Sequence, residues 1–224
     1  MSQFLDKNES VFQKKISCLQ YISQGKDRFQ HLENIEKVLR AGGNWIQLRM
    51  KEMPQNEVLK TAILARELCS KFSAKLIIND HVKVAKTCNA DGVHLGQEDT
   101  SVLEAREILG AQKLIGGTAN TLQHCLAHLE NGVDYIGLGP LRFTSTKKKL
   151  SPILGFSGYN DLMAAYSKME NTVSVIAIGG IQLSDIEVLH RIGLSGIAVS
   201  GMLTHSEYPE NEIRQILDGF AVRG

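Results

Sequence analysis

Four segments of similar character recur along this sequence, and their spacing constrains the fold more than any other feature. They cover residues 41–46, 89–94, 131–136 and 192–197, and each has the pattern of a helix end, a tight turn and a buried strand. Their first residues lie 48, 42 and 61 positions apart. This spacing indicates an array of βαβα units whose third member carries an insertion between Gly139 and Pro152.

Short apolar runs bounded by glycine, asparagine or aspartate predict eight strands. They are residues 16–22, 45–48, 76–78, 93–95, 114–115, 135–138, 173–178 and 197–199. Between the second and third runs, apolar residues at helical spacing predict an amphipathic helix over residues 57–72. Eight β/α units favour a single closed (β/α)8 TIM barrel, although an open doubly wound α/β sheet has the same local pattern. Residues 15–224 form the predicted barrel domain, and residues 1–14 a polar N-terminal extension.

Composition and charge exclude several other classes of protein. The chain of 224 residues has a formal net charge of +1, so nothing indicates a nucleic-acid or membrane surface. Its four cysteines lie far apart and form no CxxC pair, which argues against a disulfide framework or a zinc ribbon. The polar N-terminus has no apolar core of a signal peptide, and no apolar run is long enough to span a bilayer. We therefore expect a cytoplasmic protein with reduced cysteines.

The carboxyl ends of barrel strands form active sites, and basic side chains follow the second predicted strand. Strand alternation would place Gln47, Arg49 and Lys51 on one side, where two cations and an amide would form an anion-binding pocket. The same residues would also fit a strand that runs out into solvent with its charges exposed.

Acidic side chains follow the third and fourth predicted strands. Asn79 and Asp80 could cap a helix that starts near His81, and Asp99 could cap one that starts near Ser101. Alternatively, the two aspartates leave adjacent barrel strands and would share a hard cation such as Mg²⁺, which prefers oxygen ligands and often keeps phosphate oxygens in its shell.

Three later loops have the composition of phosphate-binding segments. After the sixth strand come three hydroxyl side chains and then lysines, which suit either an exposed flexible loop or a lid that grips phosphate. The seventh strand ends in two glycines and the eighth in a serine and a glycine, where backbone N–H groups could bind phosphate or simply form tight turns. The residues concerned are Thr144, Ser145, Thr146, Lys147, Gly180, Ser200 and Gly201.

Two histidines and a cysteine on a predicted helix are weaker candidates for metal binding or catalysis. His124 and His128 are four residues apart on a predicted helix, but no HExxH signature or third metal ligand accompanies them, so we expect solvent-exposed histidines. Cys125 has no base and orienting group beside it, and no cysteine nucleophile is predicted.

Taken together, the motifs resemble the thiamine phosphate synthase family. They are Gln47-Leu48-Arg49-Met50-Lys51, Ile78-Asn79-Asp80, His94-Leu95-Gly96-Gln97-Glu98-Asp99, Gly139-Pro140, Thr144-Ser145-Thr146-Lys147-Lys148 and Ile178-Gly179-Gly180-Ile181. They occur in the family's order from about residue 16 to the end of the chain. The resemblance implies a transferase of thiamine biosynthesis with two small-molecule substrates. It would join 4-amino-5-hydroxymethyl-2-methylpyrimidine diphosphate to a thiazole phosphate, giving thiamine phosphate and pyrophosphate.

The resemblance also implies a role for each site residue. Mg²⁺ would bind Asp80 and Asp99. The pyrimidine diphosphate would contact Gln47, Arg49, Lys51, Asn79, Thr118 and Lys147, and the thiazole phosphate would contact Thr144, Ser145, Thr146, Gly180, Ser200 and Gly201. In the family mechanism the bond to pyrophosphate breaks first, and the thiazole nitrogen captures the resulting methylene cation. Arg49, Lys51 and Lys147 would stabilise the leaving pyrophosphate.

The sequence departs from the family pattern at two places. Asn120 stands where many members, and the related thiazole tautomerases, carry a histidine, which argues against the tautomerase activity. Arg142 and Phe143 replace the usual apolar residue and proline before the lid. The alternatives to the synthase are a tautomerase and a noncatalytic phosphate-binding barrel, and the chain could self-associate through apolar helix faces.

Overall fold

The computed structural model describes residues 16–144, 151–170 and 172–221. Within these ranges, eight parallel strands form a closed barrel in sequence order, so the predicted TIM barrel is confirmed and the open doubly wound sheet is wrong. The strands are β1 (Leu19–Ile22), β2 (Trp45–Leu48), β3 (Lys75–Asn79), β4 (Gly92–Leu95), β5 (Leu114–Ala119), β6 (Tyr135–Leu138), β7 (Ser174–Ile178) and β8 (Gly196–Val199). The predicted extension at residues 1–14 lies outside the described residues, and the domain boundary stays a prediction.

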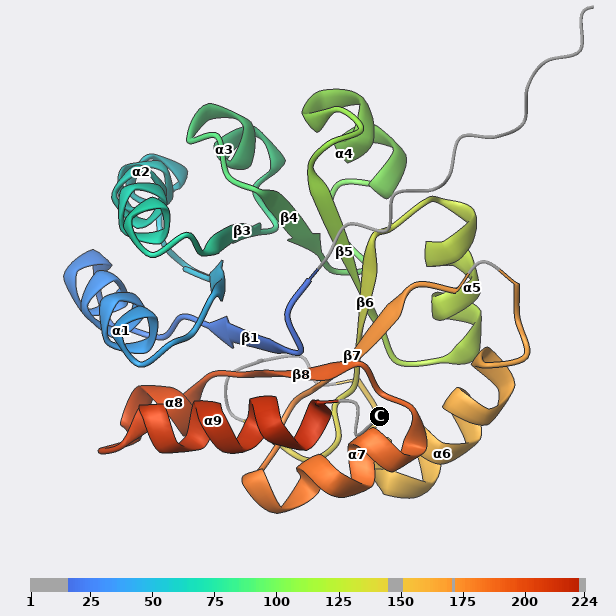
Figure 1. Ribbon diagram of the computed structural model, residues 1–224. Coiled ribbons are helices and arrows are strands. Elements are labelled where there is room, and N and C mark those ends of the chain that lie inside the picture. Colours follow the sequence, from blue (N-terminus) through green and yellow to red (C-terminus); the bar gives the residue numbers. More distant parts are fainter. Residues whose placement is uncertain (1–15, 145–150, 171, 222–224) are drawn as a thin grey trace, which may run out of the picture.

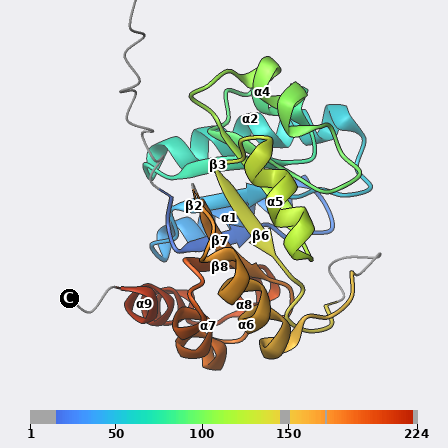
Figure 2. The ribbon, with the colours of Figure 1, turned by 90° about the vertical axis from the view of Figure 1, so that its right-hand side faces the viewer.

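Helices surround the barrel (Figure 1). They are α1 (Arg28–Arg40), α2 (Gln55–Lys71), α3 (Val82–Thr87), α4 (Val102–Leu109), α5 (Leu122–Glu130), α6 (Gly155–Tyr166), α7 (Ile186–Ile192), α8 (Gly201–His205) and α9 (Pro209–Phe220), with a short 3-10 turn, η1 (Leu183–Asp185), before α7. Viewed from the side, α2 and α4 lie across the strands from α6, α7 and α9 (Figure 2). None of the helices described is long and apolar enough to cross a membrane.

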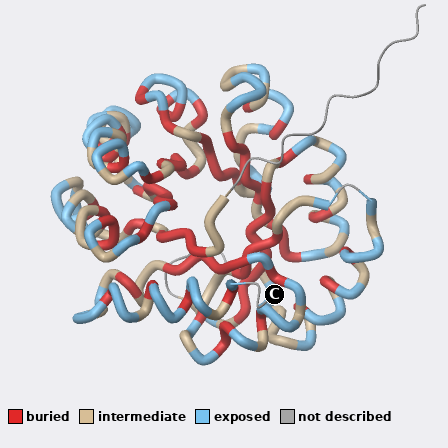
Figure 3. The backbone as a smooth tube through the Cα atoms, in the orientation of Figure 1, coloured by how far each residue is buried: buried red, intermediate tan, exposed pale blue. Residues whose placement is uncertain are grey.

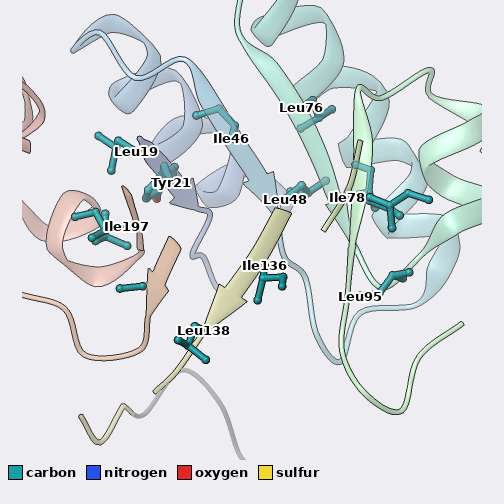
Figure 4. Close-up of a cluster of buried hydrophobic side chains, with 14 of the residues drawn as sticks. Leu19, Tyr21, Ile46, Leu48, Leu76, Ile78, Leu95, Ile136, Leu138 and Ile197 are labelled. Carbon is teal, nitrogen blue, oxygen red and sulfur yellow. The ribbon is translucent and has the colours of Figure 1, made fainter. Parts of the chain in front are cut away.

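Strand alternation divides the apolar residues into two cores. Even a four-residue strand such as β2 contributes to both, because Trp45 faces the barrel interior while Ile46 faces the helices. Burial is accordingly concentrated on the strands and on the inner faces of the helices (Figure 3). Figure 4 shows part of the outer core, where Leu48, Ile78 and Leu95 pack on neighbouring strands.

Strand β5 extends four residues beyond the end that the sequence predicts. The prediction stops at Ile115 because two glycines follow, and glycine weakens a strand unless a close approach requires it. In this strand close contacts require glycine at both positions. A Cβ on Gly116 would lie 2.1 Å from the Tyr135 ring, and one on Gly117 would lie 2.5 Å from the His128 ring. The extension carries Thr118 to the mouth of the barrel.

Candidate active site

A cavity of about 900 Å³ opens at the carboxyl ends of the strands and adjoins a smaller one of about 140 Å³ that reaches interior-facing side chains. Nine residues predicted from sequence line these two spaces: Gln47, Arg49, Lys51, Asn79, Asp80, Asp99, Thr118, Thr144 and Ser200. The fold therefore brings together side chains from β2, β3 and β5 and from the segments that follow β2, β3, β4, β6 and β8. Three predicted residues, Ser145, Thr146 and Lys147, lie outside the described residues.

The basic side of the cavity follows β2. The Arg49 N–H donates to the Ser23 Oγ at 3.1 Å, and Ser23 in turn lies 2.8 Å from the His31 Nδ1, which fixes the backbone where Arg49 leaves the strand. Burial lowers the pKa of Arg49, and the charge of Asp80 opposes this shift. The Lys51 Nζ lies 3.4 Å from the Asp80 Oδ2. The two cations thus line the same space, with Arg49 partly buried and Lys51 about half exposed to solvent.

The acidic side is formed by Asp80 and Asp99, and neither acts as the helix cap that was the alternative. Among the described residues, helix α3 has His81 at its N-cap and receives no side-chain cap bond, while Ser101 caps α4 through the Glu104 N–H. Asp99 instead accepts from the Gly96 N–H at 2.6 Å. Asp80 has a φ of 62°, a left-handed conformation that is uncommon outside glycine and concentrates at functional sites.

Burial and the neighbouring Asp99 raise the pKa of Asp80 to about 6. Two carboxyl groups held together against their repulsion suit a hard cation such as Mg²⁺. Within the described ranges, no group of three or more His, Cys, Asp and Glu residues could hold a metal ion. The donor set therefore fits a cation that takes its other ligands from substrate phosphate and water.

This raised pKa predicts that Asp80→Asn stabilises the metal-free protein. A folded-state pKa above the ordinary 3.8 means that protonated Asp80 stabilises the fold at low pH, and that this contribution disappears as the pH rises through about 6. Asparagine avoids the cost of the charged form. Thermal unfolding in EDTA should give a higher midpoint for the variant at about pH 8, and the gain should vanish near pH 4. If the variant and the wild type had the same unfolding midpoint at pH 8 as well as at pH 4, the raised pKa of Asp80 would be contradicted.

The phosphate-loop residues lie around the ends of β6, β7 and β8. Thr144 and Ser200 line the cavity, and Gly201 begins helix α8 directly after Ser200. Gly180 has a φ of 72°, and a Cβ there would lie 2.8 Å from the Arg142 Cβ, so only glycine fits this close approach. The loop after β7 and the start of the segment after β6 are therefore packed directly on one another.

Arg142 holds these two loops together, a role that the sequence did not predict. Its guanidinium forms a bidentate pair with Asp185 at 2.5 and 2.8 Å and donates to the Gly180 carbonyl at 3.2 Å. It also lies 5.3 Å from the ring centroid of Phe156. Asp185 is 2% exposed and accepts a further bond from the Gln182 N–H. The arginine that departs from the family pattern thus forms an ion pair between the segment after β6 and the loop after β7.

We expect Arg142→Leu to destabilise the fold by about 3 kcal/mol or more, because it leaves the buried Asp185 carboxylate unpaired. Urea unfolding measures the effect, and adding Asp185→Asn should recover much of it. The matched control is Arg191→Leu, which removes an exposed pair with Glu187 and should cost less than about 1 kcal/mol. Similar losses in the two single variants would show that Arg142 makes no more than a surface ion pair.

Two polar residues near β5 make buried contacts that the sequence did not predict. Asn120 is buried, and its Nδ2 donates to the Gly139 and Pro152 carbonyls, each at 2.9 Å. It joins the end of β5 to the loops after β6. The expectation of exposed histidines is wrong for His128, which is buried and lies 2.8 Å from the Thr118 carbonyl. The close approach of Gly117 creates the space that its ring fills.

The fold and this cavity define a (β/α)8 barrel whose mouth suits a phosphorylated substrate and a divalent cation. The family model described as thiamine monophosphate synthase matches residues 19–203. A thiamine-phosphate synthase of Flavobacterium johnsoniae is 49% identical over 198 residues, which cover 88% of this chain and 93% of that protein. One of Flavobacterium psychrophilum is 47% identical, with 88% and 96% covered.

A solved thiamine phosphate pyrophosphorylase from Pyrococcus furiosus superposes with a TM-score of 0.76 at 28% identity, covering 91% of this chain and 96% of that one. The chain belongs to the thiamine monophosphate synthase family. The family and the transferase class predicted from the sequence are thereby confirmed.

Proposed function

We propose that the protein joins the pyrimidine diphosphate to the thiazole phosphate, with release of pyrophosphate, through a dissociative substitution assisted by Mg²⁺. The observation that carries this proposal is the meeting of Arg49 and Lys51 with the Asp80–Asp99 pair at one barrel mouth. Cations alone would suit any phosphate. A basic pair beside an acidic pair suits a diphosphate that arrives with a divalent cation.

The leaving group is bound at the basic side in this proposal. Arg49, Lys51 and Asn79 contact the diphosphate, and Lys147 adds a further cation. As the bond to carbon breaks, negative charge grows on the pyrophosphate, and the two cations stabilise it most where water is displaced. Bound Mg²⁺, held by Asp80 and Asp99, supplies further charge stabilisation to the phosphate oxygens.

The thiazole phosphate is bound at the opposite side, by the lid and the loops after β7 and β8. Thr144, Ser145 and Thr146 offer hydroxyl groups, while Gly180, Ser200 and Gly201 let the main chain approach the oxygens closely. Binding of the phosphate orients the thiazole nitrogen toward the methylene carbon. The nitrogen is then close enough to add to a short-lived cation.

The protein supplies no covalent nucleophile in this scheme. Cys125, the cysteine between the two helix histidines, is 2% exposed, and burial raises the pKa of its thiol to about 11, so it stays a thiol at neutral pH. The site acts instead by binding, orienting and excluding water. The family's reaction needs nothing more from the side chains.

The tautomerase alternative lacks its acid/base group at position 120. An amide cannot carry a proton between two carbons, and the Asn120 Nδ2 is already engaged with two carbonyls. This supports the synthase over the tautomerase.

Mass spectrometry of the reaction products tests the proposal. Purified protein is mixed with both substrates, in Mg²⁺ and in EDTA, and we expect thiamine phosphate and pyrophosphate only with Mg²⁺. Turnover of a thiazole carboxylate phosphate alone, without metal, would instead identify a tautomerase. Tight ligand binding without any product in either tube would identify a noncatalytic barrel. The cytoplasmic location and self-association remain predictions, which fractionation and sedimentation would test.

A further inference from the structure

A continuous chain of side-chain hydrogen bonds crosses the interior of the barrel beneath the cavity. The Gln47 Nε2 donates to the Gln20 Oε1 at 2.9 Å, and the Gln20 Nε2 donates to the Tyr135 hydroxyl at 3.2 Å. That hydroxyl lies 3.0 Å from the His94 Nδ1, and the His94 Nε2 lies 2.9 Å from the Thr118 Oγ1. Five interior-facing residues from five strands are thus linked in one series.

The chain has a direction that follows from counting its protons. Tyr135 accepts from Gln20, and its buried hydroxyl proton then needs an acceptor, which an unprotonated His94 Nδ1 supplies at 3.0 Å. His94 then carries its own proton on Nε2 and donates it to the Thr118 Oγ1. With the Thr118 oxygen accepting from His94, its hydroxyl proton is available to donate to a ligand in the cavity that Thr118 lines.

At its other end, the chain of hydrogen bonds offers an acceptor instead of a donor. The Gln47 amide nitrogen is engaged with Gln20, and among the described residues no side chain donates to its carbonyl oxygen. Gln47 and Thr118 both line the 140 Å³ cavity. The chain therefore offers that space an acceptor at Gln47 and a donor at Thr118.

Burial keeps this polarity fixed. Gln20, Gln47 and Tyr135 are at most 2% exposed and His94 is 7% exposed, so water has little access to exchange with the bonds. Burial also raises the pKa of Tyr135 well above its ordinary value, which keeps the hydroxyl proton in place. Reversing one bond would require all of its neighbours to reverse as well.

We propose that Gln20, Tyr135 and His94 are positioning residues that set the donor at Thr118 and the acceptor at Gln47, and so select a heteroaromatic ring bearing an amino group and a ring nitrogen. The ligand's amino group donates to Gln47, and its ring nitrogen accepts from Thr118. A ring with an oxo group and a protonated nitrogen presents the reverse pattern and is rejected. The choice of an aminopyrimidine as this ring rests on the proposed function.

The tautomer of His94 tests the direction of the chain without substrate. Long-range ¹H–¹⁵N correlation spectra of the whole protein, at mildly alkaline pH, identify which ring nitrogen carries the proton. His94→Gln assigns the signals by their loss. We expect the proton on Nε2. A proton on Nδ1 would mean that the chain runs in the opposite sense, and would overturn the proposal whether or not the protein is a synthase.

Kinetics test the selection of the ring. Tyr135→Phe breaks the chain at its centre, and Thr118→Val removes only its donor end. Each should raise KM for the pyrimidine diphosphate about tenfold while KM for the thiazole phosphate stays the same. Tyr166→Phe removes the hydroxyl of another buried tyrosine, bonded to Val173 outside the barrel interior, and serves as the control.

A substrate analogue distinguishes a specific loss of ring recognition from a general disturbance of the active site. A pyrimidine diphosphate that lacks the amino group keeps its contact with Thr118 and loses the one with Gln47. Tyr135→Phe should therefore weaken the binding of this analogue less than it weakens the binding of the full substrate. Equal rises in KM for both substrates, or an unchanged KM in Thr118→Val, would overturn the selection. A wild-type protein that makes no thiamine phosphate would refute the proposed function, while the tautomer result would still decide the chain's direction.

Discussion

Asp80→Asn is expected to lower Mg²⁺-dependent formation of thiamine phosphate by about 100-fold or more. The substitution keeps the size of the side chain and removes the charge that binds a hard cation. Asp99 alone then faces the cavity with one carboxylate, while Lys51, which lies 3.4 Å from Asp80, loses its partner. Initial rates measured across a Mg²⁺ titration would show a lower maximum and a higher Mg²⁺ requirement.

The matched control is Asp161→Asn, which removes the same charge from an exposed position on helix α6. It should leave both the maximal rate and the Mg²⁺ dependence unchanged. An Asp80→Asn enzyme with the rate of wild type would remove Asp80 from the metal site. Together with the higher stability expected of this variant in EDTA, a lost rate would mean that the carboxyl pair is kept for function at a cost in stability.

The fold could be read from the sequence because its strands are short, buried and regularly repeated. Runs such as 45–48 and 135–138 match β2 and β6 residue for residue, since each begins after a tight turn and faces both cores. The pattern failed where tertiary contacts override local propensity. Glycine at 116 and 117 argues against a strand until the rings of Tyr135 and His128 are seen to occupy the space of the missing Cβ atoms.

The site, like the fold, has a part that the sequence predicts and a part that depends on tertiary contacts. Alternation along β2 brings Gln47 and Arg49 to the same cavity, and the positions of Asp80 and Asp99 follow from their places at the ends of adjacent strands. Partners far apart in sequence could not be predicted. Arg142 is paired with a residue 43 positions away, and Gln20 with one 115 positions away. The polarity of interior positions was the available signal for the buried chain, because polar residues there need partners.

Arg49→Met is expected to lower kcat by about 100- to 1,000-fold, with a smaller change in KM for the pyrimidine diphosphate. Charge on pyrophosphate develops as the bond breaks, so a cation beside it acts most strongly on the transition state. Arg49 is partly buried, where fields are screened less than at the half-exposed Lys51, and Lys51→Met should therefore cost less. Steady-state kinetics of the wild type, Arg49→Met and Lys51→Met show how much of each loss falls on kcat and how much on KM. The exposed Arg40→Met serves as the control. A rise in KM at constant kcat would limit Arg49 to binding the ground state, and would place the stabilisation of the leaving group on the lid lysine and the metal.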